Sequence, residues 1–179
     1  TFDGVVNISL FDKKTSFSTL GTNSGSSASP FKMWKNLIYK GKSTVTNGQF
    51  TFRLKVPKDI DYSFGSSRIS FYAENGHIDG NGSDEDLTIG GINTNATSDE
   101  VGPDVKLYMN DMNFVSGGIS NNSPTLIAHI FDSNGINTVG NGIGHDIELI
   151  LDADYANSIV LNEYYESDLD SYQSGKIFY

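Results

Sequence analysis

The sequence contains no cysteine among its 179 residues. This absence excludes disulfides, thiolate nucleophiles and zinc sites built on cysteine. Without disulfides, a small exported domain must depend on its hydrophobic core. Strong helix formers are also sparse, which argues against long helices. No segment is long and apolar enough for a transmembrane helix, and no signal peptide is visible, so we expect no direct membrane insertion.

Basic residues are in the minority: 12 Lys and Arg stand against 22 Asp and Glu, for a formal net charge of −10 and a sequence pI near 4.5. Such a protein repels the phosphates of nucleic acids and of anionic lipid surfaces, so nucleic acid is not an expected partner. The acids are spread over predicted turns and do not form one tail. We interpret them as a solvated surface, with cation binding in some turns as the alternative.

The residues that are abundant favour short strands joined by polar turns, since 11 Phe and 9 Tyr accompany many Gly, Ser, Asn and Asp. In "VVNISLF" the alternation places Val6, Ile8 and Leu10 on one face of a strand. Asn47-Gly48 predicts a tight two-residue hairpin turn, because both positions favour positive φ. Further alternating segments predict strands at 50–56, 68–73, about 105–109, 125–131, 146–151, 159–162 and 175–179. The alternation is expected to place Leu126, Ala128 and Ile130 on one face of their strand, and Ile147, Leu149 and Leu151 on one face of theirs.

These patterns predict an all-β fold of two tandem immunoglobulin-like antiparallel β-sandwiches, residues 1–97 and 98–179. The boundary is expected in the long polar region after the first half, near residues 93–102. Such a sandwich uses about seven strands, and each half shows about five. We therefore expect both sandwiches to be incomplete and the chain to be cut at both ends. In the second half, "NEYYESDLDSY" is ambiguous and is compatible with a helical turn.

Residues 134–146, "NGINTVGNGIGHD", are the most glycine-rich part of the chain. A phosphate-binding loop requires a following helix, whereas the next residues alternate as a strand. The segment is therefore predicted to be a hairpin connection shaped by glycine. His145 and Asp146 would point to opposite faces of a strand, and His77 and His129 are isolated. We predict no catalytic residue in this chain.

The polar stretch "DGNGSDED" is the candidate metal site, with calcium as the ion that its oxygen side chains would suit. Its alternating candidate ligands are Asp79, Asn81, Ser83 and Glu85. The pattern departs from the calcium loop of EF-hands at position six, which is Asp84, and at position twelve, which is Gly90. The competing interpretation is a flexible acidic loop. Asp99 and Asp104, near the expected boundary, are a second and weaker cation candidate.

Aromatic residues offer one further candidate site. Trp34 is the only tryptophan, and Phe31 and Tyr39 lie nearby in the sequence. Together they could stack on a sugar ring. Packing of Trp34 in the core is the favoured interpretation, because large aromatic side chains dominate the burial of β-sandwich cores.

Several longer segments resemble a known family. In the second half they are "GPDVKLYMND", "GINTVGNGIGHDIELILD" and "VLNEYYESDLDSYQSG", and in the first half "FDGVVNISLFDK", "SPFKMWKNLIYKGKSTVTNGQFTFRLKVPKDIDY" and "RISFYAENG". They resemble, in consistent order, the region that follows the catalytic domain in gingipain-family cysteine peptidases of the type IX secretion system. The resemblance covers nearly the whole chain.

The resemblance implies a place on the cell-surface face of the bacterial outer membrane. Family members remove the C-terminal sorting domain of exported proteins, and some join the new C-terminus to an anionic lipopolysaccharide. Their catalytic His and Cys lie in a separate upstream domain, so no catalytic residue carries over to this cysteine-free chain. The expected role is a non-catalytic accessory module. Its expected partners are the upstream peptidase domain, sorting domains and other secretion components. The alternative is a stand-alone carbohydrate- or calcium-binding adhesion module.

Overall fold

The regular structure of the described residues is almost entirely antiparallel β-sheet. A computed structural model describes residues 1–58, 60–96, 99–138 and 146–179. Within these residues there is no α-helix, and the only helical elements are two single 3₁₀ turns, η1 (Tyr155–Asn157) and η2 (Asn162–Tyr164). Over the same residues no helix is long and apolar enough to cross a membrane. The predicted all-β class is confirmed, and several antiparallel sheets agree with β-sandwich domains.

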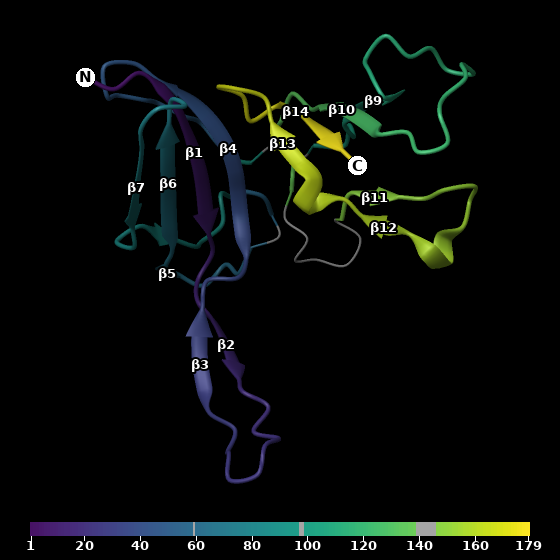
Figure 1. Cartoon of the computed structure of the whole chain (residues 1–179). Coiled ribbons are helices and arrows are strands. Elements are labelled where there is room, and N and C mark those ends of the chain that lie inside the picture. Colours follow the sequence, from purple (N-terminus) through teal and green to yellow (C-terminus); the bar gives the residue numbers. More distant parts are fainter. Residues whose placement is uncertain (59, 97–98, 139–145) are drawn as a thin grey trace.

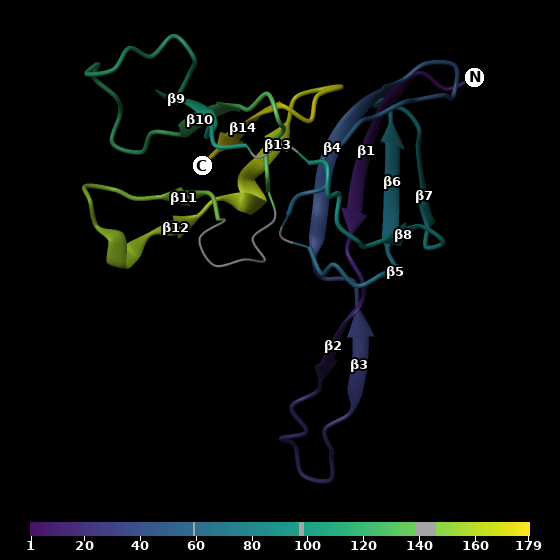
Figure 2. The same ribbon diagram turned by 180° about the vertical axis from the view of Figure 1, so that it is seen from behind.

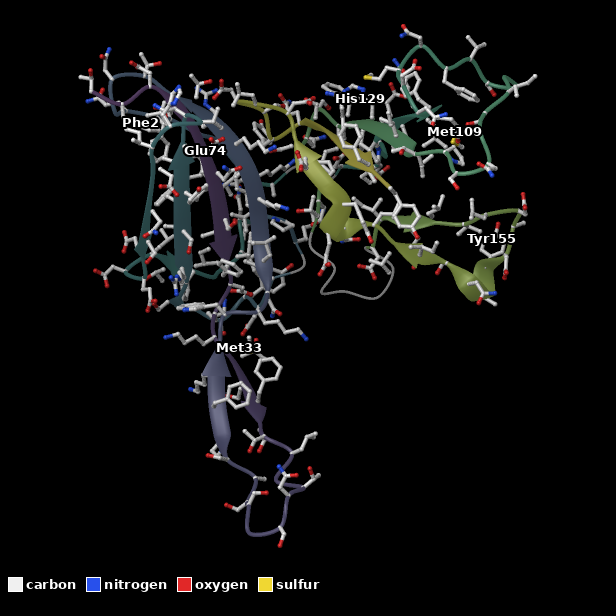
Figure 3. All side chains as sticks on the ribbon, viewed as in Figure 1. Phe2, Met33, Glu74, Met109, His129 and Tyr155 are labelled. Atoms are coloured by element: carbon white, nitrogen blue, oxygen red, sulfur yellow. The ribbon has the colours of Figure 1, made fainter. Side chains whose placement is uncertain are left out.

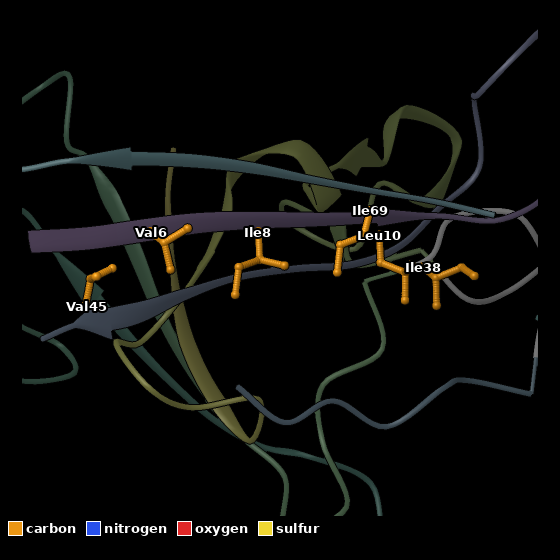
Figure 4. Packing of buried hydrophobic residues seen from close by; sticks show 6 residues of the cluster. All are labelled: Val6, Ile8, Leu10, Ile38, Val45 and Ile69. Atoms are coloured by element: carbon orange, nitrogen blue, oxygen red, sulfur yellow. The ribbon is translucent and has the colours of Figure 1, made fainter. Parts of the chain in front are cut away.

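Four antiparallel strands form the main sheet of the first half, in the order β4-β1-β6-β7 (Figure 1). Val6, Ile8 and Leu10 point from the central strand into the core and are buried, as their alternation predicts (Figure 4). Ile38, Val45 and Ile69 complete this cluster. The strands are β1 (Gly4–Phe11), β4 (Leu37–Val45), β6 (Arg68–Glu74) and β7 (Asp79–Asp84).

The predicted hairpin turn at Asn47-Gly48 is present, with φ of 54° and 78° at the two residues. The strand predicted after it, at 50–56, is wrong, because no described residue pairs with it in a ladder. Phe52 and Leu54 nevertheless pack against the core, whereas Phe50 and Val56, at the outer alternate positions, are 38% and 45% exposed. The alternation thus identifies the buried side chains only in the middle of the segment. A ladder requires in addition a neighbouring strand, and alternation in one segment carries no information about that.

Two shorter pairs flank this sheet. β5 (Gly65–Ser66) pairs with β8 (Thr88–Ile89), and β2 (Thr15–Ser18) pairs with β3 (Pro30–Met33). The β2–β3 hairpin projects away from both halves of the chain, as the two opposite views show (Figures 1 and 2).

The second half contains a sheet in the order β13-β14-β10-β9 and a separate pair, β11–β12. Leu126, Ala128 and Ile130 are buried together on one face of β10, as predicted. Leu151 was expected to share a face with Ile147 and Leu149, but it is 60% exposed, because the strand ends early and the chain enters a turn. The strands are β9 (Asp104–Met109), β10 (Leu126–Phe131), β11 (Glu148–Leu149), β12 (Ile159–Val160), β13 (Tyr165–Ser167) and β14 (Ser174–Phe178).

The ambiguous segment "NEYYESDLDSY" contains both a helical turn and a strand, since η2 leads directly into β13. The boundary between residues 97 and 98 falls outside the described residues. The division into sandwiches 1–97 and 98–179 therefore stays a prediction.

Candidate functional site

The described residues contain no group of three or more His, Asp or Glu side chains placed to hold a metal ion. The most structured polar site is instead the junction where the second half meets the edge strand β4, which we call the β4 junction (residues 42–44 with 166–170). Lys42 forms a parallel bridge with Leu169, and the Asp170 N–H donates to the Lys42 carbonyl at 3.0 Å. The backbone of the second half thereby covers part of the β4 edge of the first sheet.

The Asp170 carboxylate is the central group of the β4 junction. Its Oδ1 accepts from the Thr44 N–H at 2.7 Å and lies 2.9 Å from the Ser43 hydroxyl, and its Oδ2 accepts from Thr44 Oγ1 at 2.6 Å. These hydrogen bonds, above all those from Thr44, hold the pKa of Asp170 below its ordinary value. The Ser43 hydroxyl is also 2.9 Å from the Thr51 carbonyl. Its single proton can serve only one of these two acceptors at a time.

Asp170 has a left-handed backbone, with φ of 58°. Asp and Asn adopt this conformation more readily than most residues with a Cβ. The residue type therefore suits both the backbone and the side-chain contacts. Nothing in the local pattern of the sequence signals this role, because the contacts join residues 126 and 127 positions apart.

Charged pairs flank the Asp170 contacts. Lys42 Nζ donates to Glu166 Oε2 at 2.7 Å, and this hydrogen bond lowers the pKa of Glu166. Lys176 Nζ lies 2.8 Å from Asp168 Oδ1, and His129 Nε2 lies 3.7 Å from Asp168 Oδ2. Partial burial acts to raise the pKa of Asp168, but the hydrogen bonds to its carboxylate outweigh this effect and the pKa is lowered.

The two lysines and the two carboxylates of these pairs line a groove of about 430 Å³ between the two main sheets. Figure 3 shows Glu74 on the first sheet and His129 on the second. Both lysines of the groove are already paired with carboxylates. The arrangement therefore joins the two halves, and among the described residues that line the groove it leaves no unpaired lysine for an anionic ligand. The lining residues are Val5, Asn7, Lys42, Glu74, Glu166, Ser167, Asp168, Leu169, Lys176 and Phe178.

A second cavity, of about 290 Å³, also lies between the halves and touches the glycine-rich segment. Asn134 accepts a hydrogen bond from Lys55 at 3.0 Å. Gly135 has φ of 100°, and a Cβ there would lie 2.8 Å from Cδ2 of Tyr172. Glycine thus shapes this connection at Gly135, as predicted. The predicted hairpin is wrong, because β10 pairs with β9 and β14, whereas β11 pairs with β12. Gly140, Gly142, Gly144 and His145 lie outside the described residues.

Three of the four candidate calcium ligands do not lie on a loop, since Asp79, Asn81 and Ser83 belong to strand β7, whereas Glu85 follows the end of that strand. The expectation of a loop is wrong because β6 pairs with this segment along its whole length. Alternate residues of a strand share a face but are separated by about 7 Å, so their oxygens do not converge on one ion. Asp79 accepts from the Tyr72 hydroxyl at 2.8 Å, and Glu85 lies 3.6 Å from Arg68. Calcium binding stays a prediction that the geometry of β7 does not favour.

The other sequence candidates are also separate from one another. Asp99 borders the 290 Å³ cavity, whereas Asp104 begins β9 and lies 3.8 Å from Lys106. His77 is exposed in the turn before β7. Asp146 precedes β11 and does not belong to that strand.

The three aromatic candidates do not form one platform. Trp34 is half-buried but lies outside the core cluster, so its predicted packing in the core is wrong. The Lys14 ammonium lies 4.8 Å from the centroid of the Trp34 ring. Phe31 stacks on Phe17 in the β2–β3 hairpin. Tyr39 instead packs against the core, and burial raises its pKa.

The chain is similar to a protein of known structure. No protein-family model matches the chain, and a search of curated proteins found no match. Among solved structures, the chain is similar to dimeric latent PorU from Porphyromonas gingivalis, with 31% sequence identity and a TM-score of 0.52. The match covers 99% of this chain and 17% of the PorU chain.

This match confirms the resemblance expected from the sequence segments, and it does so at the level of PorU itself. The chain spans only 17% of the PorU structure and has no cysteine, so it is not the part of such a protein that carries a cysteine nucleophile. The chain is thus similar, over nearly its whole length, to one segment of PorU.

Proposed function

We propose that this chain is a non-catalytic β-sandwich module of a cell-surface cysteine peptidase of the gingipain family. The parent protein, similar to PorU, would process the C-terminal sorting domains of proteins exported by the type IX secretion system. The observation that carries the proposal is the match to PorU at 31% identity across 99% of the chain. The place of action would be the outer face of the bacterial outer membrane.

The β4 junction supports a positioning role for the module. Backbone pairing, the Asp170 contacts and the Lys42–Glu166 ion pair join the two sheets at one place. A module whose halves are coupled in this way can hold a neighbouring peptidase domain at a defined distance and orientation. The module would thus act as a spacer and a contact surface, while the chemistry belongs to the peptidase domain.

The free edge of β7 is the surface that we assign to sorting domains, which in this family are themselves β-sandwiches. β7 is the last strand of its sheet, and all six of its residues are exposed. An exposed edge offers unpaired backbone groups to a strand of another protein. Side chains at Gly80 and Gly82 are absent, which leaves this edge sterically open.

A lysine placed on this edge tests the proposal, because charged side chains block edge pairing. Gly82→Lys is compatible with the fold, since a Cβ at Gly82 meets no atom within 4 Å. Gly102→Lys is the matched control, because a Cβ there is equally unobstructed. Binding of a purified sorting domain to the module, measured by calorimetry, should weaken about tenfold in Gly82→Lys and remain unchanged in Gly102→Lys. Equal binding by both variants would refute the assignment of β7, and no binding by the unsubstituted module would refute the proposed partner.

A further inference from the structure

The positive charges of the chain are concentrated in one segment. Residues 13–58 contain nine of the 12 Lys and Arg residues and no Asp or Glu. This segment therefore carries a formal charge of +9 at neutral pH, while the remainder of the chain carries −19. The net charge of −10 hides a strongly basic region within an acidic protein.

The β2–β3 hairpin is the most prominent structural feature of this basic segment. Its strands pair only with each other in the described residues, and it projects from the body of the molecule (Figures 1 and 2). An isolated two-stranded hairpin is only marginally stable in water, because its apolar face lacks a packing partner. The hairpin thus has a structural reason to be covered by another surface.

One face of the hairpin is apolar. Phe17 lies opposite Phe31, and their rings stack with centroids 5.7 Å apart. Met33, two residues along the strand from Phe31, shares this face and is labelled in Figure 3 where the hairpin joins the body. Phe31 is 44% exposed and Met33 is 45% exposed. This is an apolar stripe on an element that has no second layer.

Lysines lie close to the apolar stripe, although Lys32, between Phe31 and Met33 on β3, points to the opposite face of that strand. Lys35 Nζ lies 5.6 Å from the Phe17 ring centroid, and Lys14 occupies the corresponding place over Trp34. Neither Lys32 nor Lys35 forms an ion pair with another residue that the structure describes. One ring face of Phe17 and one of Trp34 are covered by ammonium groups, which leaves less aromatic surface for stacking on a sugar.

We propose that the hairpin, with its flanking lysines (residues 13–35), is a docking arm for a second protein whose contact surface is acidic and carries apolar groups. The lysines attract the carboxylates of the partner, while Phe31 and Met33 supply the apolar area that the partner covers. The proposal does not depend on whether the parent protein is a peptidase.

The test uses the whole chain and two acidic polypeptides as probes. Trp34, the only tryptophan, belongs to the arm and reports binding through its fluorescence excited at about 295 nm, where tyrosine absorbs little. A random copolymer of glutamate and tyrosine should bind at least about threefold more tightly than poly-glutamate, because only the copolymer can cover the apolar stripe. Binding should weaken severalfold when NaCl is raised from about 50 to about 300 mM, because salt screens exposed charges.

Charge reversal identifies the arm as the binding element. The variant with Lys32→Glu and Lys35→Glu should bind the copolymer at least about tenfold more weakly. Lys106→Glu, an exposed lysine on β9, is the matched control and should bind like the unsubstituted chain. The milder variant with Lys32→Gln and Lys35→Gln should also bind the copolymer more weakly. It keeps the test valid if the charge-reversed variant misfolds, and circular dichroism checks the folding of both variants.

Four results would overturn the proposal. The first is unchanged binding by the Lys32 and Lys35 variants, and the second is an equal loss in Lys106→Glu. The third is tighter binding of polygalacturonate than of the copolymer, which would identify a carboxylated polysaccharide as the preferred partner. Failure of the copolymer to bind at low salt would also contradict the docking arm.

Discussion

Replacing Asp170 by alanine should uncouple the two halves of the chain at β4. The substitution removes the acceptor of hydrogen bonds from Thr44 N, Thr44 Oγ1 and Ser43 Oγ. Hydrogen bonds to a charged group contribute about 1.5–3 kcal/mol each when buried. Asp170 is exposed, so solvent screening reduces their sum to about 1–2 kcal/mol. Alanine in a left-handed backbone costs about 1 kcal/mol more. The expected loss of unfolding free energy is therefore about 2–3 kcal/mol.

Two further variants separate these contributions. Asp170→Asn keeps a side chain that tolerates the left-handed backbone and an oxygen that can accept from Thr44, so it should cost only about 1 kcal/mol. Asp152 has a similar φ of 51°, and no hydrogen bond of its side chain is found in the described residues. Asp152→Ala therefore measures the backbone cost without the junction, and should lose about 1 kcal/mol.

Urea unfolding followed by circular dichroism gives the free energy of each variant, and limited proteolysis reports loosening between the halves. Asp170→Ala should lose the most unfolding free energy. Asp170→Asn and Asp152→Ala should each lose less, and by similar amounts. If Asp170→Ala loses no more than Asp152→Ala, the carboxylate contributes nothing beyond its backbone conformation. The β4 junction would then not be what couples the two halves.

Three further predictions concern pH, glycine and calcium. Folding lowers the pKa values of Glu166 and Asp170, so the stabilisation from these carboxylates is present above about pH 4 and is lost as the pH falls through their folded-state pKa values. The urea midpoint should therefore fall between about pH 7 and pH 3. The fall should be smaller in Asp170→Ala. Gly135→Ala should destabilise the chain by about 1–3 kcal/mol through left-handed strain and contact with Tyr172, whereas Gly25→Ala, at φ of 81° in open space, should lose less in the same urea assay. Calcium should leave the melting temperature unchanged, because β7 spreads its oxygens; a rise that a chelator reverses would support the predicted site.

Local patterns in the sequence predict the cores of both halves well. Alternation places Val6, Ile8 and Leu10 inside the first core, and Asn47-Gly48 marks its turn. These features depend on side-chain burial and on local backbone preference, and both can be predicted from residues that are close together in the sequence.

Features that depend on distant partners are not predictable in this way. The composition of residues 79–84 is typical of a loop, but pairing with β6 makes this segment a strand. Residues 50–56 alternate but have no ladder partner among the described residues. The Asp170 contacts join segments more than 120 residues apart, so only the folded chain brings them together. The distribution of charge along the chain, in contrast, is fully visible in the sequence.

The sequence of the complete reading frame that encodes this chain would test the central proposal most directly. We expect a peptidase domain with a catalytic His and Cys upstream of residue 1. A glycosidase domain upstream, or the absence of any enzyme domain, would contradict the proposed role in a PorU-like peptidase.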